Sequence, residues 1–144
     1  MIIALVAGLL ASTSPLAEVA DTLDALMTSI NTNDADAFLA LQQPGTFIQI
    51  QRFTPDGDSK IEVVPATDLA ARMRARKGTA IDERLIEPQF FVTHDFAHVW
   101  APYTLDIAGR RSHCGVDSFG FMKTGGKWRL TSLAWTIDPN GCPK

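Results

Sequence analysis

The stretch FAHVWAPYTLDIAGRRSHCGVDSFGFMKTGGKWRLTSLAWTID, residues 96–138, decides the fold of this chain. It holds three segments rich in β-branched and aromatic residues, 97–106, 111–123 and 127–138, separated by the short joints IAGR and TGGK. Short glycine-containing joints favour hairpins. A fourth β-rich segment, 84–94, precedes them across the joint HDF. We therefore predict a long antiparallel meander in the C-terminal half.

The N-terminal half has helical periodicity instead, with apolar residues recurring at a spacing of 3.6. Helices ahead of a long meander predict an α+β fold, with the helices laid across one face of a curved antiparallel sheet. The expected elements before the meander are a helix from Glu18 to Ile30, a short second helix capped by Asn33 or Asp34, strands over 46–53 and 60–64, and a third helix from Thr67 or Asp68.

The composition describes an ordinary globular protein. Of 144 residues, 46% are hydrophobic and 20% are charged, and the net charge is −3 with acidic and basic residues interspersed. This length suits a single domain, which we place at residues 18–144. No basic surface of the kind that nucleic acids need is evident, so we expect no nucleic-acid partner.

Residues 1–17, MIIALVAGLLASTSPLA, have the pattern of a secretory signal peptide. About ten apolar residues precede small ones, whereas a membrane span takes roughly 20. We predict export to the periplasm or beyond, with no stable membrane span after processing. Two features oppose this prediction, since no Lys or Arg precedes the apolar run and Pro15 is poorly placed for cleavage after Ala17. The alternative is a native apolar helix or anchor, which would allow a cytoplasmic protein.

The order of elements and the motifs HCGVDSF (113–119) and GGKWRL…AWT in the C-terminal run resemble the nuclear transport factor 2-like superfamily, in its SnoaL-like and lumazine-binding-like branch. The resemblance covers roughly Val19 to Cys142. It implies a cone-shaped α+β fold whose curved sheet and helices enclose a pocket. Members of the superfamily include isomerases, dehydratases, cyclases and non-enzymatic binding proteins, so the resemblance supports a fold more than a function. A second subunit commonly covers the sheet, and we expect a homodimer.

Within HCGVDSF, strand geometry separates neighbouring side chains onto opposite faces. His113 and Asp117 share one face, whereas Cys114 lies on the other, which excludes a Cys–His nucleophile pair. Hairpin tips at 108–109 and 125–126 set a register that pairs Thr104 with His113 and Trp100 with Asp117. A slip of one residue would invert these faces. In this register one face carries His98, Trp100, Thr104, His113, Asp117, Phe119, Phe121, Trp128, Leu130, Ser132 and Thr136.

That face is aromatic with a few polar groups, which is typical of a ligand pocket. We predict that a small apolar or aromatic molecule binds there, without a cofactor. Asp117 is the main candidate for proton transfer, because aromatic surroundings raise the pKa of a carboxyl group, and His113 and His98 are further candidates. Each could instead hold the sheet together through hydrogen bonds. The predicted ligand-binding residues are Trp100, Thr104, Phe119, Phe121, Trp128 and Ser132.

These residues leave three functions open. The first is an exported small-molecule-binding protein, and the second is a cofactor-free isomerase or dehydratase that uses Asp117 with a histidine. The third is a scaffold that only makes subunit or partner contacts. Ketosteroid isomerase, an enzyme of the resembled fold, uses carboxylates and a tyrosine in its cone, but its positions cannot be matched here. The single tyrosine, Tyr103, falls on the opposite face in the predicted register.

The two cysteines predict a disulfide. The register places Cys114 opposite Ile137, and the turn DPNG (138–141) would return Cys142 towards it. A bridge fits an oxidising compartment, and two free buried thiols are the alternative. A metal site would need four possible ligands to come together: His94, Asp95, His98 and His113. We expect no such site, because the predicted register keeps these side chains apart.

Overall fold

Three helices lie where the sequence predicts them in the computed structural model, which describes residues 13–143. Residues 1–12 of the predicted signal peptide therefore lie outside the described residues. The first helix begins earlier than predicted because the hydroxyl of Ser14 caps it, accepting a hydrogen bond from the N–H of Ala17 at 3.2 Å. The helices are α1 (Pro15–Asn31), α2 (Ala35–Ala40), which Asp34 caps, and α3 (Ala66–Ala75).

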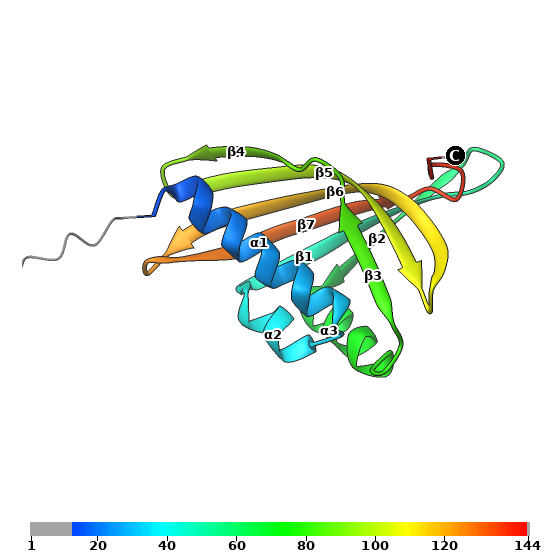
Figure 1. The fold of residues 1–144 in the computed structure, drawn as a ribbon, viewed down its shortest axis with the longest axis horizontal. Coiled ribbons are helices and arrows are strands. Elements are labelled where there is room, and N and C mark those ends of the chain that lie inside the picture. The colour runs from blue at the N-terminus through cyan, green and yellow to red at the C-terminus, as the bar shows by residue number, and fades with distance from the viewer. Residues whose placement is uncertain (1–12, 144) are drawn as a thin grey trace, which may run out of the picture.

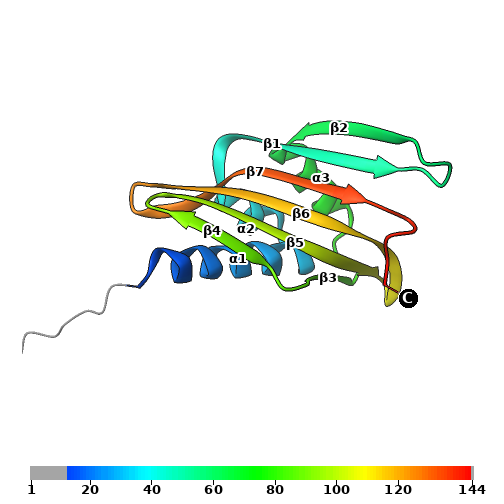
Figure 2. The ribbon, with the colours of Figure 1, turned by 90° about the horizontal axis from the view of Figure 1, so that it is seen from above.

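Seven strands form one curved sheet. They are β1 (Gln42–Phe53), β2 (Ser59–Pro65), β3 (Ile81–Leu85), β4 (Gln89–Thr93), β5 (Phe96–Ile107), β6 (Arg110–Thr124) and β7 (Lys127–Ile137). Their order is β2-β1-β7-β6-β5-β3, and β4 also pairs with β5. The helices lie together on the concave side (Figure 1, Figure 2), which confirms the predicted α+β architecture. The sheet is mixed rather than wholly antiparallel, because β1 runs parallel to its neighbour β7.

The segment 84–94, predicted as one strand, is two strands in the structure. β3 and β4 are separated by a break at Glu87, whose φ is 45°, and Pro88. β3 pairs with the C-terminal half of β5, and β4 pairs with its N-terminal half. The break allows the chain to leave the curved edge of the sheet and rejoin it, and it places β3 beside α1 at the rim of the cone.

A β-bulge in the β5–β6 hairpin shifts the register on which the predicted pocket face depended. Asp106 lies opposite Arg111, as predicted from the hairpin tip. An extra residue, Ser112, then places Leu105 rather than Thr104 opposite His113. One inserted residue moves every later side chain of one strand to the other face of the pair.

The shift inverts the faces of β5 relative to β6. Trp100 lies opposite Ser118, and Asp117 lies opposite Ala101. The predicted pairings of Trp100 with Asp117 and of Thr104 with His113 are therefore wrong. The side chains that β5 turns towards the helices are all buried: Val99, Ala101, Tyr103 and Leu105.

A second bulge, in β7, makes the register between β6 and β7 differ from the predicted one. Phe121 lies opposite Leu130, as predicted, but Phe119 lies opposite Leu133 rather than Ser132. Ser132 is consequently exposed on the convex face.

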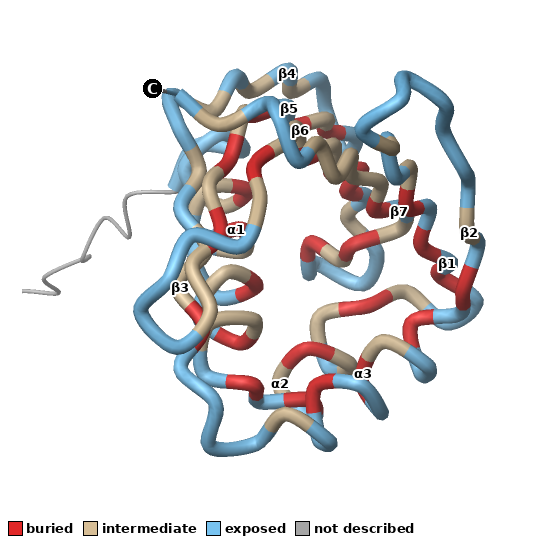
Figure 3. Tube along the Cα trace, turned by 90° about the vertical axis from the view of Figure 1, so that its right-hand side faces the viewer, coloured by how far each residue is buried: buried red, intermediate tan, exposed pale blue. Residues whose placement is uncertain are grey.

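The core fills the narrow end of the cone, between α1, α2 and the concave face of the sheet. Val19 and Leu26 of α1 and Phe38 of α2 are fully buried, and they meet Phe121 and Leu130 from β6 and β7. Viewed from one end, the sheet curls around the three helices (Figure 3). Within residues 13–143, no helix combines the length and the apolar character that a membrane crossing requires.

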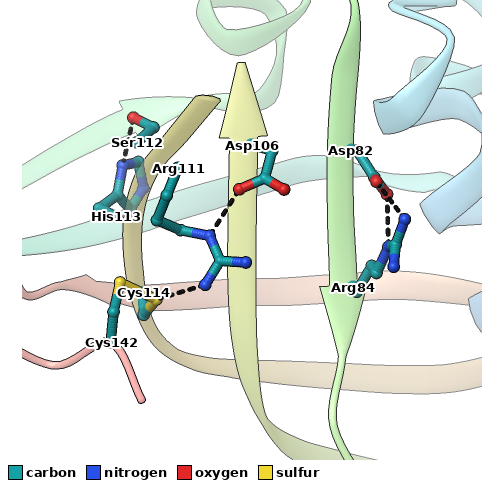
Figure 4. Close-up of polar contacts among 8 residues, drawn as sticks. All are labelled: Asp82, Arg84, Asp106, Arg111, Ser112, His113, Cys114 and Cys142. Carbon is teal, nitrogen blue, oxygen red and sulfur yellow. Dashed lines mark hydrogen bonds and ion pairs between the residues drawn. A yellow bond between two sulfur atoms is a disulfide. The ribbon is translucent and has the colours of Figure 1, made fainter. Parts of the chain in front are cut away.

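The predicted disulfide is confirmed. Cys114 and Cys142 are joined at an S–S distance of 2.05 Å. The backbone of Asp138 bonds to the carbonyl of Cys114 at 3.0 Å, one position beyond the predicted partner, and the turn after it returns the tail to the sheet. Arg111 lies above the bridge, donating to Asp106 at 2.5 Å and to the sulfur of Cys114 at 3.7 Å (Figure 4).

Candidate functional site

A cavity of about 440 Å³ lies between helix α3 and the concave face of the sheet. Its walls are mostly apolar and come from every layer, for example Ile50 of β1, Met73 of α3, Phe119 of β6, and Leu133 and Trp135 of β7. This size and character are typical of small-molecule sites. The polar and charged side chains that reach the cavity are Arg52, Arg72, Arg76, Glu83, Tyr103, His113 and Asp117.

Asp117 lies at the inner wall of this cavity and is 3% exposed. Its Oδ2 atom is buried and has no hydrogen-bond partner among the described residues. Burial, and then the negative charge of Glu83, raise the pKa of Asp117 well above its usual range. The direction agrees with the sequence prediction, although Trp100, the predicted neighbour, lies on the opposite face. The Asp117 carboxyl group can therefore be protonated at neutral pH and donate a hydrogen bond.

Glu83 on β3 is a second carboxyl group in the cavity. Burial raises the pKa of Glu83 to about 7, against an opposing effect of the positive charge of Arg76. The side-chain amide of Asn31, at the end of α1, accepts from the Glu83 N–H at 2.7 Å and donates to its carbonyl at 3.0 Å. These two bonds fix β3 against α1 and so hold Glu83 in the cavity wall. A carboxyl group with a pKa near neutrality can both give and take a proton.

Tyr103 crosses the floor of the cavity and reaches the backbone of β7. Its hydroxyl donates to the Thr136 carbonyl at 2.8 Å, and burial raises its pKa, with the charges of Asp117 and Glu83 adding to the effect. Gly115, opposite Tyr103, is required for this contact, because a Cβ there would lie 2.0 Å from the same carbonyl oxygen. Because Gly115 has no side chain, the Tyr103 side chain can reach across β6 to the backbone of β7, beside Asp117.

His113 lines the outer part of the same cavity. Its ring packs edge-on against Tyr103, with centroids 5.9 Å apart, and its Nδ1 lies 3.0 Å from the hydroxyl of Ser112 (Figure 4). Burial, and then the charge of Arg52, lower the pKa of His113. The imidazole is therefore neutral at pH 7 and available as a proton acceptor.

The predicted site residues separate into three groups. His113, Asp117 and Phe119 line the cavity. Phe121 and Trp128 belong to the buried core at the narrow end, where the Trp128 indole donates to Glu18 at 2.9 Å. The remaining four lie on the convex face or at its edge: His98, Trp100, Thr104 and Ser132. On that face the Nε2 atom of His98 is 3.5 Å from the Ser118 hydroxyl.

Sequence reasoning missed Glu83 and Tyr103. The signal for Glu83 was available, because Ile81, Glu83 and Leu85 alternate along one strand, and a carboxylate between two inward apolar residues must also point inward. The signal for Tyr103 was hidden by the bulge at Ser112. Among residues 13–143, no group of three or more His, Cys, Asp or Glu side chains is arranged to hold a metal ion.

Comparisons with known proteins identify the fold. No protein-family model matches the chain, and no curated protein matches it. Among solved structures, an NTF2-like protein from Cytophaga hutchinsonii matches with a TM-score of 0.71 at 16% identity, over 88% of this chain and 100% of the other. A protein of unknown function from Nostoc punctiforme, described as having a cystatin-like fold, matches with a TM-score of 0.65 at 17% identity, over 90% and 96% of the chains.

A third neighbour comes from the NTF2-like family of Streptomyces avermitilis and is provisionally named a dehydratase. It matches with a TM-score of 0.61 at 15% identity, over 85% of this chain and 94% of the other. Identities this low establish a shared fold, whereas function depends on the residues within the cone.

Proposed function

Because the chain has the nuclear transport factor 2-like fold, we propose that it is a small-molecule-binding protein whose cone holds a small, largely apolar or aromatic ligand. The observation that carries the proposal is the unpartnered Oδ2 of Asp117 in an apolar cavity. Buried polar atoms almost always have a hydrogen-bond partner, and a ligand that offers an acceptor oxygen would supply the missing one.

Two matched probes test this proposal, naphthalene as the apolar body alone and 2-naphthol as the same body with one hydroxyl. We expect both to bind, and Asp117→Leu to weaken 2-naphthol about tenfold while leaving naphthalene nearly unchanged, since only one hydrogen bond is lost. Ser118→Ala, on the adjacent residue but the opposite face, is the control. Titration followed by tryptophan fluorescence measures each affinity. Failure of both probes to bind would reject the proposal.

A second candidate function is cofactor-free proton transfer, as in an isomerase or dehydratase. It is favoured by the two carboxyl groups with raised pKa, Asp117 and Glu83, and by neutral His113 in the same cavity. Groups whose pKa lies near the working pH are suited to general acid–base catalysis. His98, named with them from the sequence, faces away from the cavity.

Exchange of the acidic C–H protons of 2-tetralone for deuterium tests proton transfer without knowledge of the substrate. We expect the protein to accelerate exchange, and Asp117→Asn or Glu83→Gln to slow it by about 100-fold or more. Ser118→Ala should exchange as the wild type does. If the wild type exchanged these protons no faster than buffer, the proton-transfer function would be rejected and only the binding function would remain.

Export is also proposed, and the Cys114–Cys142 disulfide supports it, because such bonds persist in oxidising compartments. Expression of the full chain followed by fractionation and N-terminal sequencing tests this. A processed protein outside the cytoplasm is expected. A full-length protein retained in the cytoplasm would contradict export.

We further propose that the convex face of the sheet is covered by a second copy of the chain. Eight large apolar side chains stand exposed there, more than a solvated face normally carries. Sedimentation equilibrium should give a dimer for the wild type and a monomer for Trp100→Glu, and a monomeric wild type at high concentration would reject the pairing. The eight are Phe47, Phe53, Ile61, Val63, Phe91, Phe96, Trp100 and Met122.

A further inference from the structure

Three arginines gather on one side of the cavity. Arg52 comes from the C-terminal end of β1, Arg72 from the last turn of α3, and Arg76 from the residue that caps the C-terminus of α3. Arg52 and Arg72 lie at the rim, because their side chains are 51% and 44% exposed, whereas Asp117 at the inner wall is almost fully buried. The cavity is therefore polarised, with cations at its mouth and carboxyl groups, aromatic rings and aliphatic side chains further in.

The positive charge at the mouth is only partly balanced. Glu62 on β2 pairs with Arg72 at 2.5 Å and lies 4.0 Å from Arg52, so one carboxylate serves two guanidinium groups. Among the described residues, no carboxylate lies within 4.0 Å of the Arg76 guanidinium, and its buried Nε has no hydrogen-bond partner. An unpaired, partly buried guanidinium is an unfavourable state that an anion would relieve.

Arg76 is held in place at this mouth. The side-chain amide of Asn33 donates to the carbonyl of Arg76 at 3.4 Å and to that of Thr79 at 3.0 Å, which ties the end of α3 to the end of α1. Asn31, two residues earlier, ties Glu83 to the same point. The backbone at Arg76 and at Glu83 is thus fixed by two asparagines at one helix end, so no backbone segment has to be ordered there when a ligand binds.

We propose that the ligand of this cavity is an organic monocarboxylate, with its apolar body inside the cone and its carboxylate at Arg76 and Arg52. A guanidinium group matches a carboxylate with two parallel hydrogen bonds, which makes arginine the preferred partner for this group. Glu62 balances one of the three arginine charges, and the carboxylate of the ligand would balance a second. The inference deepens the proposed binding function and depends on it.

The test compares 2-naphthoate with methyl 2-naphthoate, which share the apolar body and differ in charge. We expect the acid to bind wild-type protein about tenfold or more tightly than the ester. Arg76→Gln and Arg52→Gln should each lower the affinity for the acid by about tenfold, and should leave the ester within about twofold. Isothermal titration calorimetry measures the affinity of each of the three proteins for both compounds.

Arg74→Gln is the matched control. Arg74 lies on the same helix, two residues from Arg76, but it points to solvent, pairs with Asp36 at 2.5 Å and does not reach the cavity. It should change neither affinity. Equal binding of acid and ester, unaffected by the Arg76 and Arg52 variants, would overturn the inference and leave the proposed binding function intact. Failure of both compounds to bind would overturn both together.

Discussion

The two faces of strands β5, β6 and β7 carry different chemistry although they are made of alternating residues. On the concave face, Asp117 and Tyr103 are almost completely buried and line a cavity. On the convex face, Trp100 is 39% exposed and His98 makes only a long contact with Ser118. Burial thus shifts the pKa of the concave groups, whereas the convex face remains open to solvent or to a partner. One residue of register decides which chemistry a side chain acquires.

Truncation of one phenylalanine on each face gives the largest contrast. Phe119→Ala should lower the free energy of unfolding by about 3–5 kcal/mol, because Phe119 is 1% exposed and stacks on Phe121. The same truncation at Phe91, which is 59% exposed on the convex side, should cost about 0.5 kcal/mol or less in dilute protein. Urea denaturation measures both. Similar losses at the two positions would show that the faces are not distinguished by burial.

The disulfide on the convex side should have nearly as large an effect. Cys142→Ser should lower the free energy of unfolding by about 3–4 kcal/mol, because the bond closes a loop with a sequence separation of 28. Reduction of the wild type should reproduce the loss, which serves as the control. A loss below about 1 kcal/mol would mean that the tail is held mainly by non-covalent contacts such as the Asp138–Cys114 backbone bond.

The raised pKa of Glu83 predicts a pH dependence that belongs to the concave side. The folded state keeps the proton between the ordinary pKa of 4.5 and about 7, whereas the unfolded state releases it. Stability should therefore fall as pH rises through this window, by up to about 3 kcal/mol, and change little above it. Glu83→Gln should reduce the slope of the profile measured by urea denaturation from pH 4.5 to 8, and the raised pKa of Asp117 should account for the slope that remains. An unchanged slope in the variant would assign the dependence to other groups.

The smallest expected effect tests the floor of the cavity. Tyr103→Phe removes the hydrogen bond to the Thr136 carbonyl and should cost about 1–2 kcal/mol, because the carbonyl then loses its buried partner. Ser118→Ala, which breaks only the 3.5 Å contact with His98, should be neutral within about 0.5 kcal/mol. Thermal denaturation of both variants checks this. A neutral Tyr103→Phe would indicate that water replaces the hydroxyl.

Three of the nine residues predicted for the site line the cavity, and the other six do not. His113, Asp117 and Phe119 share a face because alternation along a single strand is a local property. Their partners across the sheet depend on register, and the extra residues in β6 and β7 moved Thr104, Trp100 and Ser132 away from them. A bulge leaves no compositional signature in these strands, so a register counted from the hairpin tips cannot detect it.

The sequence by itself determined the α+β class, the order of the elements, both hairpin tips of the C-terminal meander and the pairing of the two cysteines. These features follow from periodicity and turn chemistry, which act over a few residues. Only the tertiary structure decided that β1 runs parallel to β7, that 84–94 breaks into two strands, and that Tyr103 and Glu83 meet Asp117 in one cavity. Those outcomes depend on packing between segments far apart in the chain. There, a single inserted residue changes which side chains face each other, whatever the local preferences are.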